Sequence, residues 1–124
     1  GKLDVFQGLH LLYALASGID CIHQLGEYHG DLHTDNIIIK RKGVGFEVKL
    51  LDFYDWKTPK KANIRDDVTD LIRIFYDAIG GQKTYAKHPL IAKSIICGLK
   101  KTLILKKFRT AGQLRKHLET MSWD

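Results

Sequence analysis

The chain has 124 residues, of which 44% are hydrophobic and 27% are charged, with only two prolines. This composition is typical of a globular protein with a hydrophobic core, and the length predicts a single domain over residues 1–124. No apolar run approaches the ~20 residues that a membrane span needs, and no segment resembles a signal peptide. Two isolated cysteines, Cys21 and Cys97, are expected to be buried free thiols, which favours a cytoplasmic location.

The net charge of +6 is unevenly distributed along the chain. Residues 78–118 contain eight Lys and two Arg but no Asp or Glu. Such a stretch is most simply a solvated helical surface, and it can also attract an acidic partner such as nucleic acid or acidic lipid. It contains no known nucleic-acid-binding motif, and its lysines do not alternate with aromatic residues.

The first predicted element is a long helix over residues 3–25, followed by Gly26 as a stop signal. Apolar residues recur at the three- and four-residue spacing of a helix face that packs against a core. These residues are Val5, Leu9, Leu12, Ala16 and Ile19, and Leu11, Leu15, Ile22 and Leu25 widen the face. The polar residues 28–36 are expected to form a loop directly after this helix.

The next pattern predicts a small β-hairpin. Residues 37–39 are three isoleucines, and residues 46–50 alternate between apolar and polar side chains. Residues 40–45 between them form a charged turn with two glycines. Because a hairpin brings its two outer ends together, Asn36 and Asp52 are predicted to be neighbours.

The remaining elements are predicted to be helices. Residues 54–65 are interpreted as an exposed loop. The apolar residues of 68–79 then fit the helical spacing, and Asp66 and Asp67 are expected in the first turn of that helix. Residues 80–81 (Gly-Gly) are expected to end it. A further helix is expected to start at Pro89, with an apolar seam of Ile91, Ile95, Leu99 and Leu103. The last helix, about 111–121, is expected to be capped by Thr110 and Gln113 and to bury Leu114, Leu118 and Met121. The predicted fold class is therefore mainly α with one small β-hairpin.

Three side chains would converge at one end of the hairpin: Asp31, Asn36 and Asp52. Oxygen ligands such as Asn36 and Asp52 suit Mg²⁺, which proteins often hold with one or two carboxylates plus substrate phosphates. Asp31 can then accept a proton from an attacking hydroxyl, as phosphoryl transfer requires. A zinc site using His29 and His33 is an alternative, but it lacks a third strong ligand on a helix.

These residues also carry a resemblance to a known family. Residues 29–36 (HGDLHTDN) resemble the catalytic loop of the protein-kinase-like superfamily, and residues 52–54 (DFY) resemble its metal-binding Asp-Phe-Gly motif. Residues 67–68 resemble the start of the helix that supports that loop, and residues 108–114 resemble the segment that closes a kinase domain. The resemblance covers nearly the whole chain, and it implies the C-terminal lobe of the kinase-like α+β fold.

The resemblance implies a role for each matching residue. Asp31 would be the catalytic base, and Asn36 and Asp52 would bind the Mg²⁺ that accompanies ATP. His33 stands where protein kinases usually have a Lys that contacts the transferred phosphate, so it would act there as a hydrogen-bond donor. Asp67 would hold the backbone of the catalytic loop by hydrogen bonds.

Departures from the family pattern bear on the acceptor and on regulation. Gly30 replaces the Arg that receives an activation-loop phosphate in many protein kinases, so this switch is not expected. Only fourteen residues separate Asp52 from Asp67, which leaves a very short segment for docking a peptide. The expected function is an atypical bacterial-type Ser/Thr protein kinase. The alternatives are a small-molecule kinase similar to aminoglycoside or choline kinases, and a pseudokinase that binds a partner without catalysis.

The ATP-covering half of a kinase has no counterpart in these 124 residues. There is no glycine-rich phosphate loop, no strand with the nucleotide-binding Lys and no partner Glu. The expected partners are therefore the protein's own N-terminal lobe, which these residues lack, and either a protein or a small hydroxyl-bearing substrate. Residues 1–124 alone are expected to show no ATP turnover.

Overall fold

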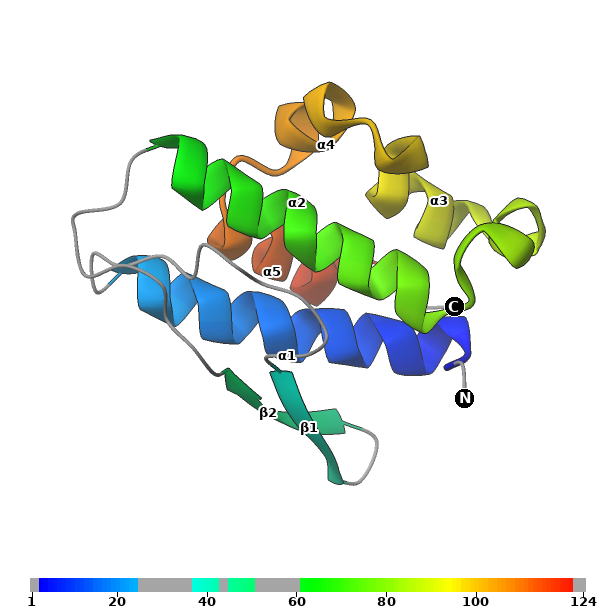
Figure 1. The fold of residues 1–124 in the computed structure, drawn as a ribbon, viewed down its shortest axis with the longest axis horizontal. Helices are drawn as coiled ribbons and strands as arrows, with labels where there is room; N and C mark the ends of the chain where they lie inside the picture. The colour runs from blue at the N-terminus through cyan, green and yellow to red at the C-terminus, as the bar shows by residue number, and fades with distance from the viewer. Residues whose placement is uncertain (1–2, 25–36, 43–44, 51–60, 122–124) are drawn as a thin grey trace.

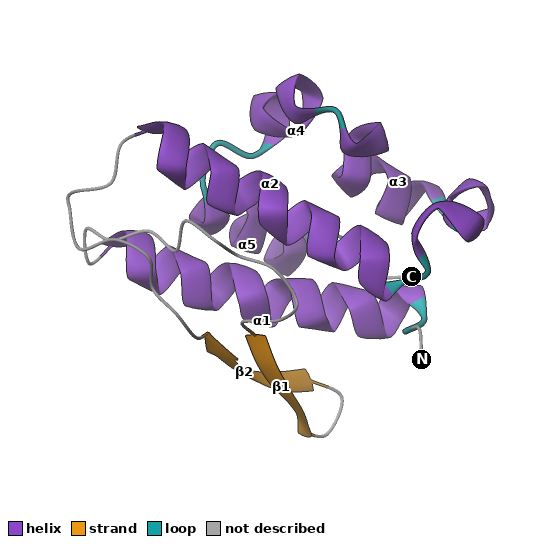
Figure 2. Cartoon of the chain, in the orientation of Figure 1, coloured by secondary structure: helices purple, strands orange, loops and turns teal. Residues whose placement is uncertain are grey.

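The computed structural model describes residues 3–24, 37–42, 45–50 and 61–121, with side chains described for residues 3–21 and 65–121. The helices are α1 (Val5–Gln24), α2 (Lys61–Ala78), α3 (Leu90–Ile96), α4 (Lys101–Lys107) and α5 (Ala111–Thr120), as Figure 1 shows. Two strands, β1 (Ile37–Lys42) and β2 (Gly45–Leu50), and short 3₁₀ turns complete the described part. Most of these residues are helical (Figure 2), in agreement with the predicted mainly α class.

The core lies between α1, α2 and α5. The two long helices run antiparallel, so the C-terminal end of α1 and the N-terminal end of α2 lie at the same end of the molecule (Figure 1). α1 contacts both α2 and α5, whereas α3 and α4 contact α2. The apolar residues predicted for the α1 and α2 faces are almost all fully buried, among them Leu9, Leu12, Leu15, Ile19, Val68, Leu71, Ile72, Phe75 and Ile79.

A reciprocal cap fixes the start of α1. The Gln7 backbone N–H donates to Asp4 Oδ1 at 2.7 Å, and the Asp4 N–H donates to Gln7 Oε1 at 3.2 Å. The two bonds satisfy two backbone donors that a helix end would otherwise leave unpaired. The helix therefore begins at Val5, two residues later than predicted. The signal was present in the sequence as an Asp followed three residues later by a Gln.

The strands β1 and β2 pair antiparallel, with Ile37 opposite Leu50 and Lys42 opposite Gly45. The predicted six-residue turn is too long, because residues 40–42 belong to β1 and Gly45 belongs to β2. Charged residues are compatible with a strand when alternate positions face solvent, so their charge alone was a poor turn signal. β2 lies against α1, on the side away from α2 (Figure 1).

The start of α2 differs from the prediction. The helix begins at Lys61, so part of the predicted loop 54–65 is helical, and Asp66 and Asp67 lie in the second turn, beyond the first-turn position. The apolar period marks only the part of a helix that faces the core, and Lys61 and Ala62 are good helix formers that extend it. α2 ends at Ala78, before Gly80 and Gly81 with positive φ values of 115° and 62°, as predicted.

The single helix predicted after Pro89 is in fact two short helices with a break. Cys97, Gly98 and Leu99 all have positive φ, between 54° and 62°, which a continuous α-helix does not allow. Gly98 has no Cβ penalty in this conformation, and it sits at the centre of the break. The predicted seam is consequently wrong in its second half, because Leu99 is only partly buried and Leu103 is exposed. The side chains that α3 and α4 bury are Ala92, Ile95, Ile96 and Ile104.

The capping of α5 follows the prediction with one difference. The Gln113 N–H donates to Thr110 Oγ1 at 3.1 Å, while Gln113 Oε1 accepts from the Arg109 N–H at 2.8 Å and not from Thr110. Leu114 and Leu118 are fully buried, and Met121 is partly buried against the core.

Among the described residues, no helix is long and apolar enough to cross a membrane. Of the two cysteines, which the structure shows as free, Cys21 is exposed, so its predicted burial is wrong.

Candidate functional site

The four residues of the predicted catalytic and metal site lie outside the described residues. They are Asp31, His33, Asn36 and Asp52. The elements that flank them are described, and these elements limit where the intervening chain starts and finishes. The chain leaves α1 at Gln24 and enters α2 at Lys61, at the same end of the molecule (Figure 1).

The strand pairing sets a second limit. Ile37 lies opposite Leu50, so the first residue of β1 and the last residue of β2 are paired. In sequence, Asn36 directly precedes Ile37, and Asp52 follows Leu50 by two residues. Asn36 and Asp52 can be neighbours only if the two strands pair in this way. That the two side chains are neighbours stays a prediction.

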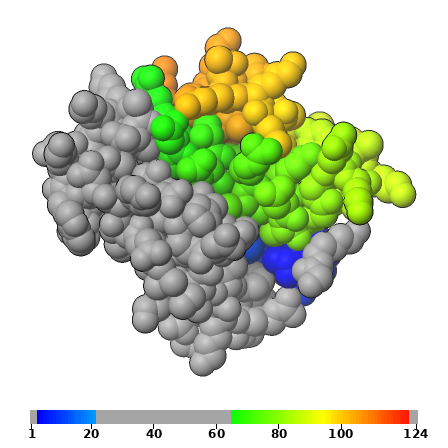
Figure 3. All heavy atoms as spheres, viewed as in Figure 1, coloured from blue at the N-terminus to red at the C-terminus, as the bar shows by residue number. Residues whose placement is uncertain are grey.

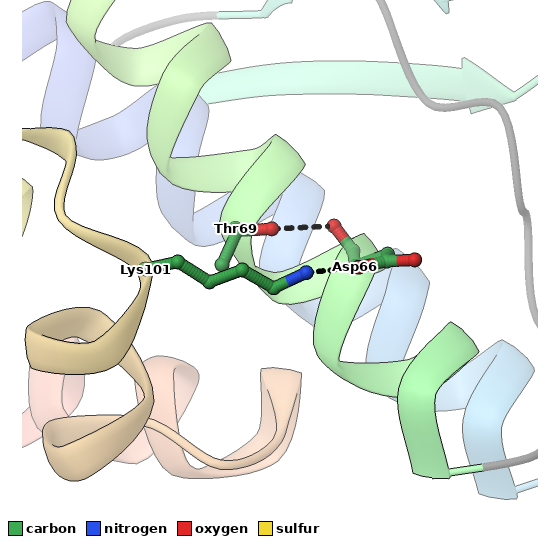
Figure 4. A network of polar contacts seen from close by, with 3 residues as sticks. All are labelled: Asp66, Thr69 and Lys101. Carbon is green, nitrogen blue, oxygen red and sulfur yellow. Dashed lines mark hydrogen bonds and ion pairs between the residues drawn. The ribbon is translucent and has the colours of Figure 1, made fainter.

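Two adjacent carboxylates on α2 lie in opposite environments. Asp67 is fully buried, whereas Asp66 is half exposed and pairs with Lys101 on α4 at 2.6 Å, as Figure 4 shows. Thr69 Oγ1 also donates to the Asp66 backbone carbonyl at 3.0 Å. Asp67 lies one helical turn before the buried Leu71, so its position on the helix directs it inward. A buried carboxylate is costly unless it is hydrogen-bonded or paired, and Asp67 does make an interaction within the protein.

Asp20 on α1 is a second buried carboxylate. Its residue is only 8% exposed, and its Oδ2 lies 3.6 Å from Arg115 on α5. Gly112 on α5 provides the space, because a Cβ there would lie 2.7 Å from Asp20 Oδ1. Asp20 follows the buried Ala16 by four residues, and this spacing was the available signal. The pair links the C-terminal part of α1 to the middle of α5. Among the described residues, no cluster of His, Cys, Asp and Glu has the arrangement of a metal site.

Comparison with protein families identifies the family of this chain. The family described as the lipopolysaccharide kinase (Kdo/WaaP) family matches residues 7–88, more than half of the chain. The chain belongs to the Kdo/WaaP lipopolysaccharide kinase family. The matched range includes the predicted catalytic loop, both paired strands and Asp67.

Protein kinases are also similar to part of this Kdo/WaaP family member. CBL-interacting protein kinase 17 of Oryza sativa subsp. japonica is 36% identical over 53 residues, which are 43% of this chain and 11% of that protein. Serine/threonine-protein kinase pkn2 of Myxococcus xanthus is 38% identical over 53 residues, 43% of this chain and 6% of that protein. The similarity thus spans only about a tenth or less of each relative's length. No solved structure matches the chain.

The described residues of this Kdo/WaaP kinase family member also include a basic region beyond the family match. Lys106, Lys107, Arg109 and Lys116 line an open hollow of about 500 Å³ between the end of α4 and α5. His117 lines the same hollow and packs edge to face on Phe108, with 5.2 Å between ring centroids. Burial of the ring, and secondarily the charge of Lys107, lower the pKa of His117 below its ordinary value of 6.5.

The lowered pKa of His117 predicts a pH dependence of stability. The unfolded chain binds a proton at His117 near pH 6.5, and the folded protein binds it only at lower pH. The unfolded state therefore holds more protons in this window, so the free energy of unfolding should fall as the pH is lowered through and below 6.5. Urea unfolding between about pH 5 and pH 7.5 measures this slope.

The matched variants for this measurement are His117→Gln and Lys107→Gln. His117→Gln should flatten the slope that His117 contributes, because the titrating group is gone. Lys107→Gln should shift the His117 imidazole titration, followed by NMR, towards 6.5, because one of the two causes of the lowered pKa is removed. A slope that is unchanged in His117→Gln would contradict the assignment.

Proposed function

We propose that residues 1–124 carry the base-bearing and metal-binding half of an ATP- and Mg²⁺-dependent phosphotransferase, corresponding to the C-terminal lobe of a kinase-like domain. The observation that supports the proposal most is the family match over residues 7–88. The three residues with the chemistry of phosphoryl transfer, Asp31, Asn36 and Asp52, all fall inside it. A second lobe that covers ATP is the partner that this half requires.

In the proposed site, Asp31 accepts the proton of the attacking hydroxyl and orients its oxygen toward the γ-phosphate. Asn36 and Asp52 offer the amide and carboxylate oxygens that Mg²⁺ prefers, and the pairing of Ile37 with Leu50 supports their proximity. Bound Mg²⁺ supplies neutralisation of the charge on the phosphates. His33 donates a hydrogen bond to the transferred phosphate, and the buried Asp67 orients the catalytic loop from α2.

Two classes of acceptor are candidates for the transferred phosphate. A saccharide hydroxyl is the first, because the matching family is described by its lipopolysaccharide kinases. The short segment between Asp52 and Asp67 favours this choice, since it leaves little chain for docking a peptide. A Ser or Thr hydroxyl of a protein is the second candidate, because the relatives named above are protein kinases.

The test is phosphate transfer from radiolabelled ATP by the intact protein. Purified lipopolysaccharide, generic Ser/Thr peptides and small amino alcohols are offered separately, with and without EDTA. We expect transfer to lipopolysaccharide that EDTA abolishes. Transfer only to peptides would select the second candidate, and the absence of transfer to every acceptor would leave the pseudokinase alternative and reject the phosphotransferase.

A further inference from the structure

A contiguous basic surface lies where α2, α4 and α5 approach one another. The hollow between α4 and α5 has a neighbour of about 440 Å³, which Arg65 of α2 lines together with Thr102 and Leu105 of α4. Lys106 and Arg109 line both hollows, so the two are adjacent. The α4–α5 basic surface is defined here as the five cationic residues of both hollows: Arg65, Lys106, Lys107, Arg109 and Lys116.

The charges of this surface are not neutralised by nearby acids. All five residues are solvent-exposed. Within the described part of the chain, none of them pairs with a carboxylate, whereas two neighbouring cations do: Lys101 with Asp66 and Arg115 with Asp20. Lys107 Nζ donates to the Ser94 backbone carbonyl at 2.6 Å, which holds the ammonium in place without removing its charge. A multiply charged anion is the complementary partner.

One exposed apolar residue beside these cations, Leu103, helps to distinguish between classes of polyanion. Leu103 is 44% exposed and lies three and four residues before Lys106 and Lys107, on the same side of α4. The aromatic ring of this region, Phe108, is only 3% exposed, so it offers no face on which a base can stack. Aliphatic side chains flanked by Lys are instead the pattern of a surface that contacts a bilayer.

The position of α4 in the fold suits such a contact. α4 packs on α2 and forms the outer edge of the molecule in Figure 3, where its atoms are gold and orange. Of its seven residues, only Ile104 is fully buried. The helix therefore presents Lys106 and Leu103, both exposed, to the surroundings.

We propose that the α4–α5 basic surface docks the protein on an anionic lipid bilayer, with Lys106 and Arg109 at its centre and Leu103 entering the headgroup region. Four of its five residues, all except Arg65, lie beyond residue 88 and so outside the family match, and none of the five is a proposed catalytic residue. His117 lines the hollow, so anionic headgroups bound there should raise its lowered pKa.

The experiment is co-sedimentation of the intact protein with vesicles of phosphatidylcholine alone or with about 30% phosphatidylglycerol. We expect binding only to the anionic vesicles, weakened when salt is raised from about 0.1 M to about 0.5 M. Each cation near an anionic surface contributes about fivefold in partitioning, so Lys106→Gln/Arg109→Gln should bind about 25-fold more weakly. Leu103→Gln should also weaken binding, and this loss should persist at high salt.

The matched control is Lys83→Gln/Lys87→Gln, which removes the same charge from two exposed lysines at the other end of α2. α2 rises about 20 Å from Arg65 to its end at Ala78, which is longer than the screening distance, and both lysines follow that end. The control should therefore bind nearly as well as the wild type. An equal loss of vesicle binding in both double variants would mean that only net charge matters, and it would overturn the assignment of binding to the α4–α5 basic surface. Equal binding to neutral vesicles, or no binding to either, would overturn the proposal, as would tighter binding to a duplex oligonucleotide.

Discussion

Replacement of Asp31 by Asn in the intact protein is expected to lower the rate of phosphoryl transfer by about 10³-fold, while binding of Mg²⁺–ATP is retained. The substitution keeps the size and polarity of the side chain but removes the basic oxygen that accepts the proton of the acceptor hydroxyl. If Asp31 is the base, the loss should appear in kcat with little change in the KM for ATP. Single-turnover transfer and equilibrium nucleotide binding measure the two quantities.

Two further variants give this experiment its controls. Asp52→Ala should lose metal-dependent nucleotide binding, because it removes a proposed Mg²⁺ ligand, and so it should fail at an earlier step than Asp31→Asn. Asp35→Asn removes a carboxylate from the same loop without touching the proposed base or ligands, and it should keep most of the activity. Wild-type activity in both Asp31→Asn and Asp52→Ala would show that the site is assigned to the wrong residues.

The second large effect is on stability, and it comes from the close approach of α1 and α2. Gly8 is buried on α1, where an added Cβ would clash with Ile79 Cγ2 and lie 3.0 Å from Phe75 Cε1. Ile79 is β-branched and fully buried, so its methyl group cannot move aside without disturbing the core. Gly8→Val should therefore lower the free energy of unfolding by about 3 kcal/mol in a urea titration.

Gly18 is the matched control on the same helix. A Cβ at Gly18 would meet no atom within 4 Å, so the steric crowding found at Gly8 is absent there. Gly18→Val should change the free energy of unfolding by no more than about 0.5 kcal/mol, because the intrinsic preferences of Gly and Val in a helix differ little. Equal destabilisation by the two substitutions would attribute the effect to helix propensity, and the steric explanation for Gly8 would be wrong.

The buried faces of the main helices could be predicted from the amino-acid sequence. The periodic apolar residues of α1 and α2 are almost all buried, and Thr110 caps α5, because these signals depend on residues three or four positions apart in the same helix. The motifs around Asp31 and Asp52 predicted a kinase-like protein, and the family match agrees with that class. The roles of the individual site residues remain predictions, since those residues lie outside the described part.

The positions where the helices break, and the identity of the buried polar groups, depend on tertiary contacts. The left-handed residues at 97–99 divide an apolar pattern that looked continuous, so that Ile96 and Ile104 are buried from two separate helices while Leu103 is exposed. Asp20 is buried because Gly112 and Arg115, over ninety residues later, accommodate its carboxylate. Likewise, Arg65 joins Lys106 and Arg109 only through packing of α2 against α4. These features depend on contacts between distant segments, and a local pattern of charge or hydrophobicity does not contain that information.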